Sequence, residues 1–196
     1  MMKVAILALQ GAFAEHQAAF RDLGVETLQI RQLTDLARPF DALVLPGGES
    51  TVQGKLLYEL GLFAPIRSLI REGLPVMATC AGLILLAERL ADDPKVWFGT
   101  LHASVRRNAY GRQLGSFCTQ GNCGELTDIP MTFIRAPYIE ECAPDVTILS
   151  RYADKITAVR QGNQLAMSFH PELLPDRRLH EYFLQQMVAT AQKIAV

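Results

Sequence analysis

Cys80 is the residue of this chain whose surroundings best suit a nucleophile. A short apolar run up to Thr79 predicts a buried strand and residues 83–90 predict a buried helix, so Cys80 falls on the turn between them. Small residues, Ala78 and Gly82, stand two positions to either side, as a tight nucleophile elbow requires. The start of the following helix offers free N–H groups that favour a thiolate and, later, an oxyanion. The alternative is a packed core cysteine, because free cysteine is among the most buried residue types.

A cysteine nucleophile needs a general base, and the base needs a group that orients it. The chain supplies both in Ser168-Phe169-His170-Pro171-Glu172. Residues i and i+2 of an extended segment point to the same side, so we expect His170 and Glu172 to face one way. A carboxylate beside an imidazole fixes its tautomer and stabilises the imidazolium. We therefore predict that Cys80, His170 and Glu172 form a catalytic triad that the fold assembles.

The composition describes a soluble protein of ordinary charge. With 196 residues, 49% of them hydrophobic, and a net charge of -1, the chain is expected to form a single domain over residues 1–196. A pI of about 6.4 argues against a nucleic-acid or acidic-membrane partner, since both call for a basic face. Neither a signal peptide nor a membrane-spanning apolar run is recognisable. We expect a cytoplasmic protein whose four cysteines are reduced.

The elements that would position the triad alternate in the first half of the chain. Apolar runs predict strands at residues 3–9, 25–30, 42–45 and 74–79, and helical spacing predicts helices at 12–23, 50–60 and 62–71, with Ser50 as a cap. Such alternation implies an open, mostly parallel, doubly wound sheet, whose ligands bind at the carboxyl ends of the strands. Gln10, the loop at residues 46–50 and Cys80 all lie at such ends. We expect them to converge on one site.

The second half is expected to form an antiparallel section at the edge of the sheet. Strands are predicted near residues 103–107, 131–135 and 146–152, and a hairpin joins 158–161 to 164–167 through Gly162-Asn163, a favoured two-residue turn. The second hairpin strand would deliver His170 to the site. A helix is predicted from Arg178. Within the helical patterns, His16 and His180 are interpreted as surface residues.

Six segments resemble the class I, triad-type glutamine amidotransferases, which have a flavodoxin-like α/β fold. They are residues 7–13 (LALQGAF), 45–51 (LPGGEST), 79–83 (TCAGL), 107–113 (RNAYGRQ), 133–137 (FIRAP) and 168–173 (SFHPEL). The cysteine elbow and the His-Pro-Glu segment are shared across that class. The first, fourth and fifth segments are similar to one branch in particular, the glutaminase subunits of pyridoxal 5'-phosphate synthase.

This resemblance implies hydrolysis of L-glutamine to glutamate and ammonia through a glutamyl thioester on Cys80, with His170 as base and Glu172 as its orienting group. The family's oxyanion hole maps onto backbone N–H groups of Gly47 or Gly48 and of Ala81. Its glutamine-binding positions map onto Gly48, Glu49, Ser50, Arg107, Ile134 and Arg135. From charge alone, we infer that an arginine holds the substrate α-carboxylate and Glu49 its α-amino group.

The resemblance also implies a partner, a synthase subunit with a (β/α)8 barrel that receives the ammonia without its release. Gln10 matches a family position at that subunit contact. We expect docking to reorganise Gly47 and Gly48 into an oxyanion hole. No metal and no organic cofactor are implied for this chain.

Four features depart from the family pattern, and three rival readings stay open. Ala78 stands where the family commonly has glycine, Val52 replaces a common second threonine, Met167 replaces a smaller polar residue, and residues 117–124 match no pattern of the family. The first rival is another enzyme of the same fold, such as the glutaminase of a different biosynthetic complex or a γ-glutamyl hydrolase. The second is a catalytically silent docking or regulatory module, and the third is a disulfide-prone or metal-sensing protein. The last rests on Cys118 and Cys123, which are better interpreted as loop thiols.

Overall fold

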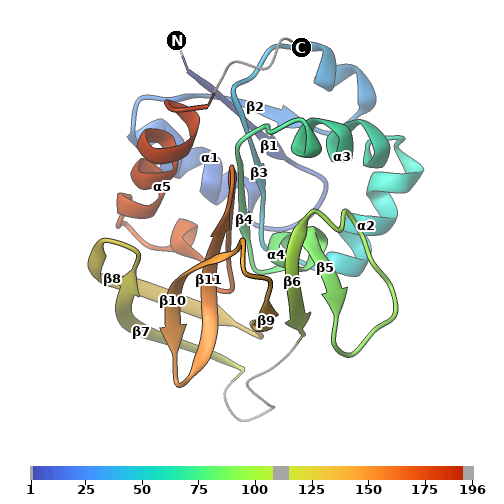
Figure 1. The fold of residues 1–196 in the computed structure, drawn as a ribbon. Coiled ribbons are helices and arrows are strands. Elements are labelled where there is room, and N and C mark those ends of the chain that lie inside the picture. The colour runs from blue at the N-terminus through green and yellow to red at the C-terminus, as the bar shows by residue number, and fades with distance from the viewer. Residues whose placement is uncertain (1, 108–114, 192–196) are drawn as a thin grey trace.

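The computed structural model describes residues 2–107 and 115–191, and its main feature is a ten-stranded sheet with helices on both faces (Figure 1). The first part of the chain alternates strands and helices, as the hydrophobic pattern predicts. Its elements are β1 (Lys3–Leu7), α1 (Phe13–Asp22), β2 (Glu26–Ile30), the 3-10 turn η1 (Leu33–Ala37), β3 (Ala42–Leu45), α2 (Ser50–Glu59), α3 (Phe63–Arg71), β4 (Val76–Thr79) and α4 (Ala81–Leu86).

Strands dominate the second part, and the chain then returns to helix. The strands are β5 (Ala87–Leu90), β6 (Leu101–Arg106), β7 (Ser116–Cys123), β8 (Leu126–Ile134), β9 (Tyr138–Cys142), β10 (Thr147–Tyr152), β11 (Lys155–Gln161) and β12 (Gln164–Met167). The 3-10 turn η2 (Pro171–Leu173), helix α5 (Arg178–Phe183) and the π-helical turn η3 (Leu184–Val188) follow. None of the helices in the described ranges is long and apolar enough to cross a membrane.

The sheet has a parallel half and a mainly antiparallel half. Its strand order is β2-β1-β3-β4-β12-β11-β9-β6-β5, with β10 paired to β11 outside this path. The first five strands of that order pair in parallel, while the pairs β12–β11, β11–β9 and β9–β6 are antiparallel. The predicted open sheet with an antiparallel edge section is confirmed, although the outermost pair, β5 and β6, is parallel.

Alternate residues of the central strands enter two different cores. In β1, Ala5 and Leu7 belong to the core that includes residues of α2, α3 and α4, whereas Val4 and Ile6 belong to the core that includes residues of α1 and α5. Successive side chains of a strand point to opposite faces, so a strand buried on both faces is apolar throughout. Figure 1 shows α1 and α5 on one side of the sheet and α2 to α4 on the other.

The predicted hairpin is confirmed and explains how the two halves of the site meet. Gly162 has the positive φ of 53° that its turn requires, and Gln161 pairs with Gln164 across it. The second hairpin strand, β12, then lies parallel to β4, with Met167 beside Thr79. Residues that follow β12 therefore emerge next to the residue that follows β4.

Residues 83–90, expected to be one helix, divide into two elements. Helix α4 ends at Leu86, and Ala87 begins β5, where it pairs with Leu101 of β6. The helical residues are all buried, and a short apolar run of this kind does not by itself distinguish a buried helix from a buried strand.

Cys118 and Cys123 were interpreted as loop thiols, but the structure places both in strand β7, which contains most of residues 117–124. This strand pairs with β8 in a separate two-stranded sheet, and Phe117 stacks on Phe133 with ring centroids 4.7 Å apart. Cys118 is exposed and Cys123 is buried, and burial raises the pKa of the Cys123 thiol to about 12. All four cysteines lie in the described ranges and are free thiols.

Candidate active site

Cys80 occupies a strained turn between β4 and α4. Its φ of 46° and ψ of -97° are uncommon for a residue with a side chain. Gly82 lets the helix pass close to β3, because a β-carbon there would lie 2.1 Å from the carbonyl oxygen of Leu45. Ala78 is fully buried within β4, so its extra methyl group is accommodated. The strand, turn and helix start predicted around Cys80 are therefore present.

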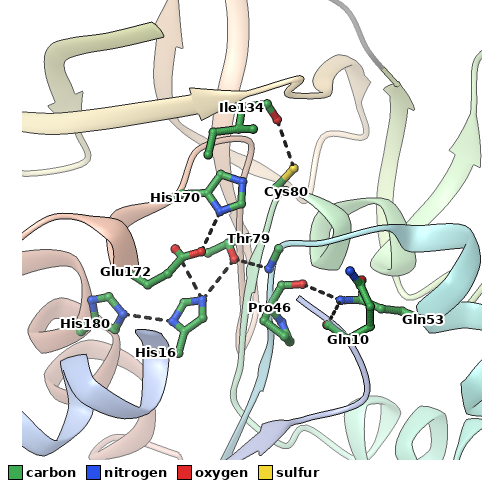
Figure 2. A network of polar contacts seen from close by, with 11 residues as sticks. Gln10, His16, Pro46, Gln53, Thr79, Cys80, Ile134, His170, Glu172 and His180 are labelled. Carbon is green, nitrogen blue, oxygen red and sulfur yellow. Dashed lines mark hydrogen bonds and ion pairs between the residues drawn. The ribbon is translucent and has the colours of Figure 1, made fainter. Parts of the chain in front are cut away.

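His170 and Glu172 lie where the chain leaves β12. The Nδ1 atom of His170 is 2.7 Å from Oε1 of Glu172, and both side chains are buried. We predicted that the two residues lie on an extended segment, and this prediction is wrong. Pro171 begins the 3-10 turn η2, which brings Glu172 back under the imidazole. Figure 2 shows the ring of His170 between Glu172 and Cys80.

The charges of this pair are set by burial and by near neighbours. Burial lowers the pKa of His170, but Cys80 and Glu172 outweigh it and raise that pKa to about 10. Burial raises the pKa of Glu172, but the imidazoles of His16 and His170 outweigh it, so the carboxyl group has a pKa below its usual value. At neutral pH the pair is therefore an imidazolium held by a carboxylate. An imidazolium in this position can protonate a leaving group.

The end of β8 covers Cys80 from the other side. The sulfur of Cys80 lies 3.9 Å from the carbonyl oxygen of Ile134, which is the last residue of β8. The next residue, Arg135, is exposed and has a φ of 41°. Figure 2 shows Ile134, one of the two predicted binding residues of this segment, beside the cysteine.

The glycine loop after β3 is packed against the same imidazole. A β-carbon on Gly47 would lie 2.1 Å from Cε1 of His170, and one on Gly48 would lie 2.4 Å from Oε1 of Gln10. The N–H of Gly47 donates to the hydroxyl of Thr79 over 2.9 Å, so it is already engaged. Ala81, the other predicted oxyanion donor, is the first residue of α4.

Gln10 joins this loop to the end of β1. Its side-chain oxygen accepts a hydrogen bond from the N–H of Glu49 over 2.7 Å, and its carbonyl oxygen accepts one from the side chain of Gln53 over 2.8 Å. Gln53 also donates to Pro46 over 3.2 Å and is fully buried, a role that its helical position did not reveal. Ser50, predicted to cap α2, is instead its first residue.

Arg107 has acidic partners of its own in this structure. Its guanidinium lies 3.4 Å from a carboxylate oxygen of Asp92 and 3.0 Å from one of Asp93. Its role toward a substrate stays a prediction. The rest of the segment that it begins, up to residue 113, lies outside the described residues.

His16 and His180, predicted to be surface residues, are both fully buried. They lie behind the triad, with His16 3.5 Å from Glu172 and 3.1 Å from His180. The spacing contained a usable signal, because His16 stands three residues after Phe13 and four before Phe20, on the apolar face of its helix.

Comparison with known proteins identifies the group of enzymes to which this site belongs. A model of the SNO glutamine amidotransferase family matches residues 6–189. The chain belongs to this family. Among curated relatives, the pyridoxal 5'-phosphate synthase subunit PdxT of Desulfitobacterium hafniense (strain DSM 10664 / DCB-2) is 56% identical over 186 residues, covering 95% of this chain and 94% of the relative. The corresponding PdxT of Bifidobacterium longum (strain NCC 2705) is 50% identical over 185 residues, covering 91% and 97%.

Solved structures share this fold. A crystal structure of a glutamine amidotransferase has a TM-score of 0.88 and 43% sequence identity, covering 93% of this chain and 97% of that one. The structure of PurLQS from Thermotoga maritima has a TM-score of 0.68 at 17% identity, covering 94% and 98%, and shares the fold alone. The resemblance drawn from the six sequence segments is confirmed.

Proposed function

We propose that this chain is a single glutaminase domain over residues 1–196, the subunit of a pyridoxal 5'-phosphate synthase that hydrolyses L-glutamine to glutamate and ammonia. The observation that carries this proposal is the meeting of Cys80, His170 and Glu172 at the carboxyl ends of two neighbouring parallel strands. Family membership and the PdxT relatives support it, because they cover nearly the whole chain.

The reaction would proceed in two steps that reuse His170. The thiolate of Cys80 attacks the side-chain amide carbon of glutamine, and the amide oxygen becomes an oxyanion. The imidazolium of His170 gives its proton to the nitrogen, the C–N bond breaks, and ammonia leaves a glutamyl thioester on sulfur. Water then attacks the thioester and gives a proton to His170. The C–S bond breaks and glutamate is released.

The residues at the predicted glutamine-binding positions would hold the substrate. Gly48 and Glu49 are exposed on the loop beside His170, and Ser50 follows them at the start of α2. Ile134 approaches the sulfur from the end of β8, and Arg135 is the exposed residue that follows it. A guanidinium of Arg135 or Arg107 suits the α-carboxylate of glutamine, and the carboxylate of Glu49 suits its α-amino group.

The partner would be the synthase subunit, a (β/α)8 barrel, and Gln10 would form part of the contact with it. In the chain alone, the N–H of Gly47 is bonded to Thr79, while Gln10 holds the N–H of Glu49. Docking would release the Gly47 or Gly48 N–H groups toward the oxyanion, where they would act together with Ala81. A cytoplasmic location is part of the same proposal.

Glutamate release from L-glutamine tests the function directly. It is measured with and without the synthase subunit, for the wild-type chain, for Cys80→Ala, and for Cys118→Ala as a matched control on an exposed thiol. We expect release that depends on the partner, is lost in Cys80→Ala and is retained in Cys118→Ala. Bound glutamine without release in the wild-type complex would point to a silent docking module. Undiminished release by Cys80→Ala would remove Cys80 as nucleophile.

A further inference from the structure

The carboxylate of Glu172 faces a second histidine on the side away from Cys80. One oxygen, Oε1, lies 2.7 Å from Nδ1 of His170, and the other, Oε2, lies 3.5 Å from Nε2 of His16. The side chains of His16 and Glu172 have no exposed surface. Figure 2 shows His16 and His170 on either side of this carboxylate, with His16 reaching it from helix α1.

His16 also contacts the support of the glycine loop. Its Nε2 atom lies 3.2 Å from the hydroxyl of Thr79, the residue before Cys80, and that hydroxyl accepts the N–H of Gly47 over 2.9 Å. One buried imidazole therefore contacts both the acid of the triad and the threonine that holds the glycine loop. A 1 Å error in the position of such groups is enough to reduce catalysis about 100-fold.

The charges around His16 favour a neutral ring. Burial lowers its pKa, as do His170 and Arg177, and this outweighs the opposite effect of Glu172 and Glu15. Its neighbour His180 has a pKa well below the usual value, because it is buried beside His16 and Arg177. When His16 is neutral, the imidazolium of His170 is the cation that pairs with the carboxylate of Glu172.

The neighbours of His16 also select its tautomer. Within the described ranges, Oε2 of Glu172 has no hydrogen-bond partner, and Nε2 of His16 is 3.5 Å from it. A carboxylate oxygen can only accept, so we place the single proton of a neutral His16 on Nε2, between Glu172 and Thr79. Its Nδ1 then accepts the Nε2–H of His180 over 3.1 Å. Nδ1 of His180, which has no hydrogen-bond partner among the described residues, is left as a bare nitrogen. The N–H of His180 then points to His16, and the N–H of His16 points toward Glu172.

We propose that His16 is a positioning residue of the glutaminase reaction, which aligns the Glu172 carboxylate and the Thr79 hydroxyl so that one side chain sets both the triad and the glycine loop. His180 fixes the tautomer in which His16 can do this. The proposal rests on the glutaminase function proposed above.

Three substitutions of His16 separate this role from packing. His16→Gln keeps an amide N–H close to the place of Nε2, His16→Asn has the same chemistry but is too short to reach Glu172, and His16→Leu removes the polar group. We expect kcat of the complex to fall about 10- to 100-fold in the Asn and Leu variants, the size of one lost contact to a buried charge, with KM for glutamine little changed. The Gln variant should lie closest to the wild type.

A second readout needs neither substrate nor partner. The carboxyl carbon of Glu172 is followed by NMR across pH in the chain alone, and its midpoint should move to higher pH in the Asn and Leu variants and less in the Gln variant. If all three variants keep the wild-type kcat and midpoint, or if Gln and Asn lose activity equally and in proportion to thermal stability, the proposal is overturned. Failure of the proposed function would instead appear as a wild-type complex without glutamate release, while the NMR comparison would still report on His16.

Discussion

Gly47 lies directly against the imidazole of His170. A β-carbon on Gly47 would come within 2.1 Å of Cε1 and 2.7 Å of Nδ1 of that ring. Gly47 is not among the glycines with a positive φ, so the lack of space beside His170, rather than its backbone conformation, requires glycine here. The loop that would stabilise the oxyanion and the base that would move the proton therefore share one contact surface.

Gly47→Ala is expected to displace the ring of His170. The added methyl group has nowhere to go, so the glutaminase activity of the complex should fall by about 100-fold or more. Stability to urea should fall by roughly 1–3 kcal/mol, as for other overpacked sites. Gly115→Ala is the matched control, because a β-carbon at Gly115 meets nothing within 4 Å. Equal activity of the two variants would show that the ring is not held against Gly47.

Substitution of the two small residues of the elbow should have effects of very different size. A methyl group on Gly82 would meet the backbone of β3 at 2.1 Å, so Gly82→Ala should destabilise the chain by roughly 1–3 kcal/mol and abolish activity. Ala78→Gly should cost only about 0.5–1 kcal/mol, through backbone entropy, and leave kcat close to that of the wild type. Urea unfolding and glutamate release measure both effects. A Gly82→Ala variant with wild-type stability would contradict the close packing of α4 on β3.

Acid should destabilise the protein through His16 and His180, the two buried histidines whose pKa is lowered; His170, whose pKa is raised, acts in the opposite direction. Burial holds the pKa of His180 well below the usual value and lowers that of His16. In the unfolded chain both histidines have a pKa of about 6.5. Below that pH the unfolded state binds more protons than the folded state, so the free energy of unfolding falls as pH falls. The slope is at most about 1.4 kcal/mol per pH unit for each histidine.

Urea unfolding between pH 7 and pH 5 tests this linkage. His180→Phe should lose some stability at pH 7, because Nδ1 of His16 loses its partner, yet show a shallower decline toward pH 5. A decline as steep as that of the wild type would mean that other groups cause the acid sensitivity.

The sequence was sufficient to predict the turn at Cys80, because an apolar strand, small residues on either side and an apolar helix all act locally. The hairpin around Gly162 was equally predictable from its turn residues. The pairing of β12 with β4 was not, since it joins strands far apart in the chain, yet it is what brings His170 to Cys80. The residue types and the family resemblance indicated that Cys80 and His170 meet, although no local pattern predicts this strand pairing.

The incorrect predictions have physical causes. His16 and His180 were assigned to the surface because of residue type, whereas a buried histidine is acceptable when it has a polar partner such as Glu172. The division of residues 83–90 between α4 and β5 depends on pairing with β6, which a buried apolar run does not reveal. The hairpin of β7 and β8, in contrast, is local, since Cys123 pairs with Leu126 across Gly124, which has a φ of 58°.

The central claim is that the sulfur of Cys80 forms the covalent bond to the substrate. A diazoketone analogue of L-glutamine tests it, because a nucleophilic thiolate displaces nitrogen gas from it and keeps the carbon skeleton as a thioether. The complex is treated with the analogue and the modified peptide is located by mass spectrometry. We predict one adduct per chain, on the peptide that contains Cys80, prevented by excess L-glutamine and absent in Cys80→Ala. An adduct that persists in Cys80→Ala, or that forms equally on Cys118, would contradict the account.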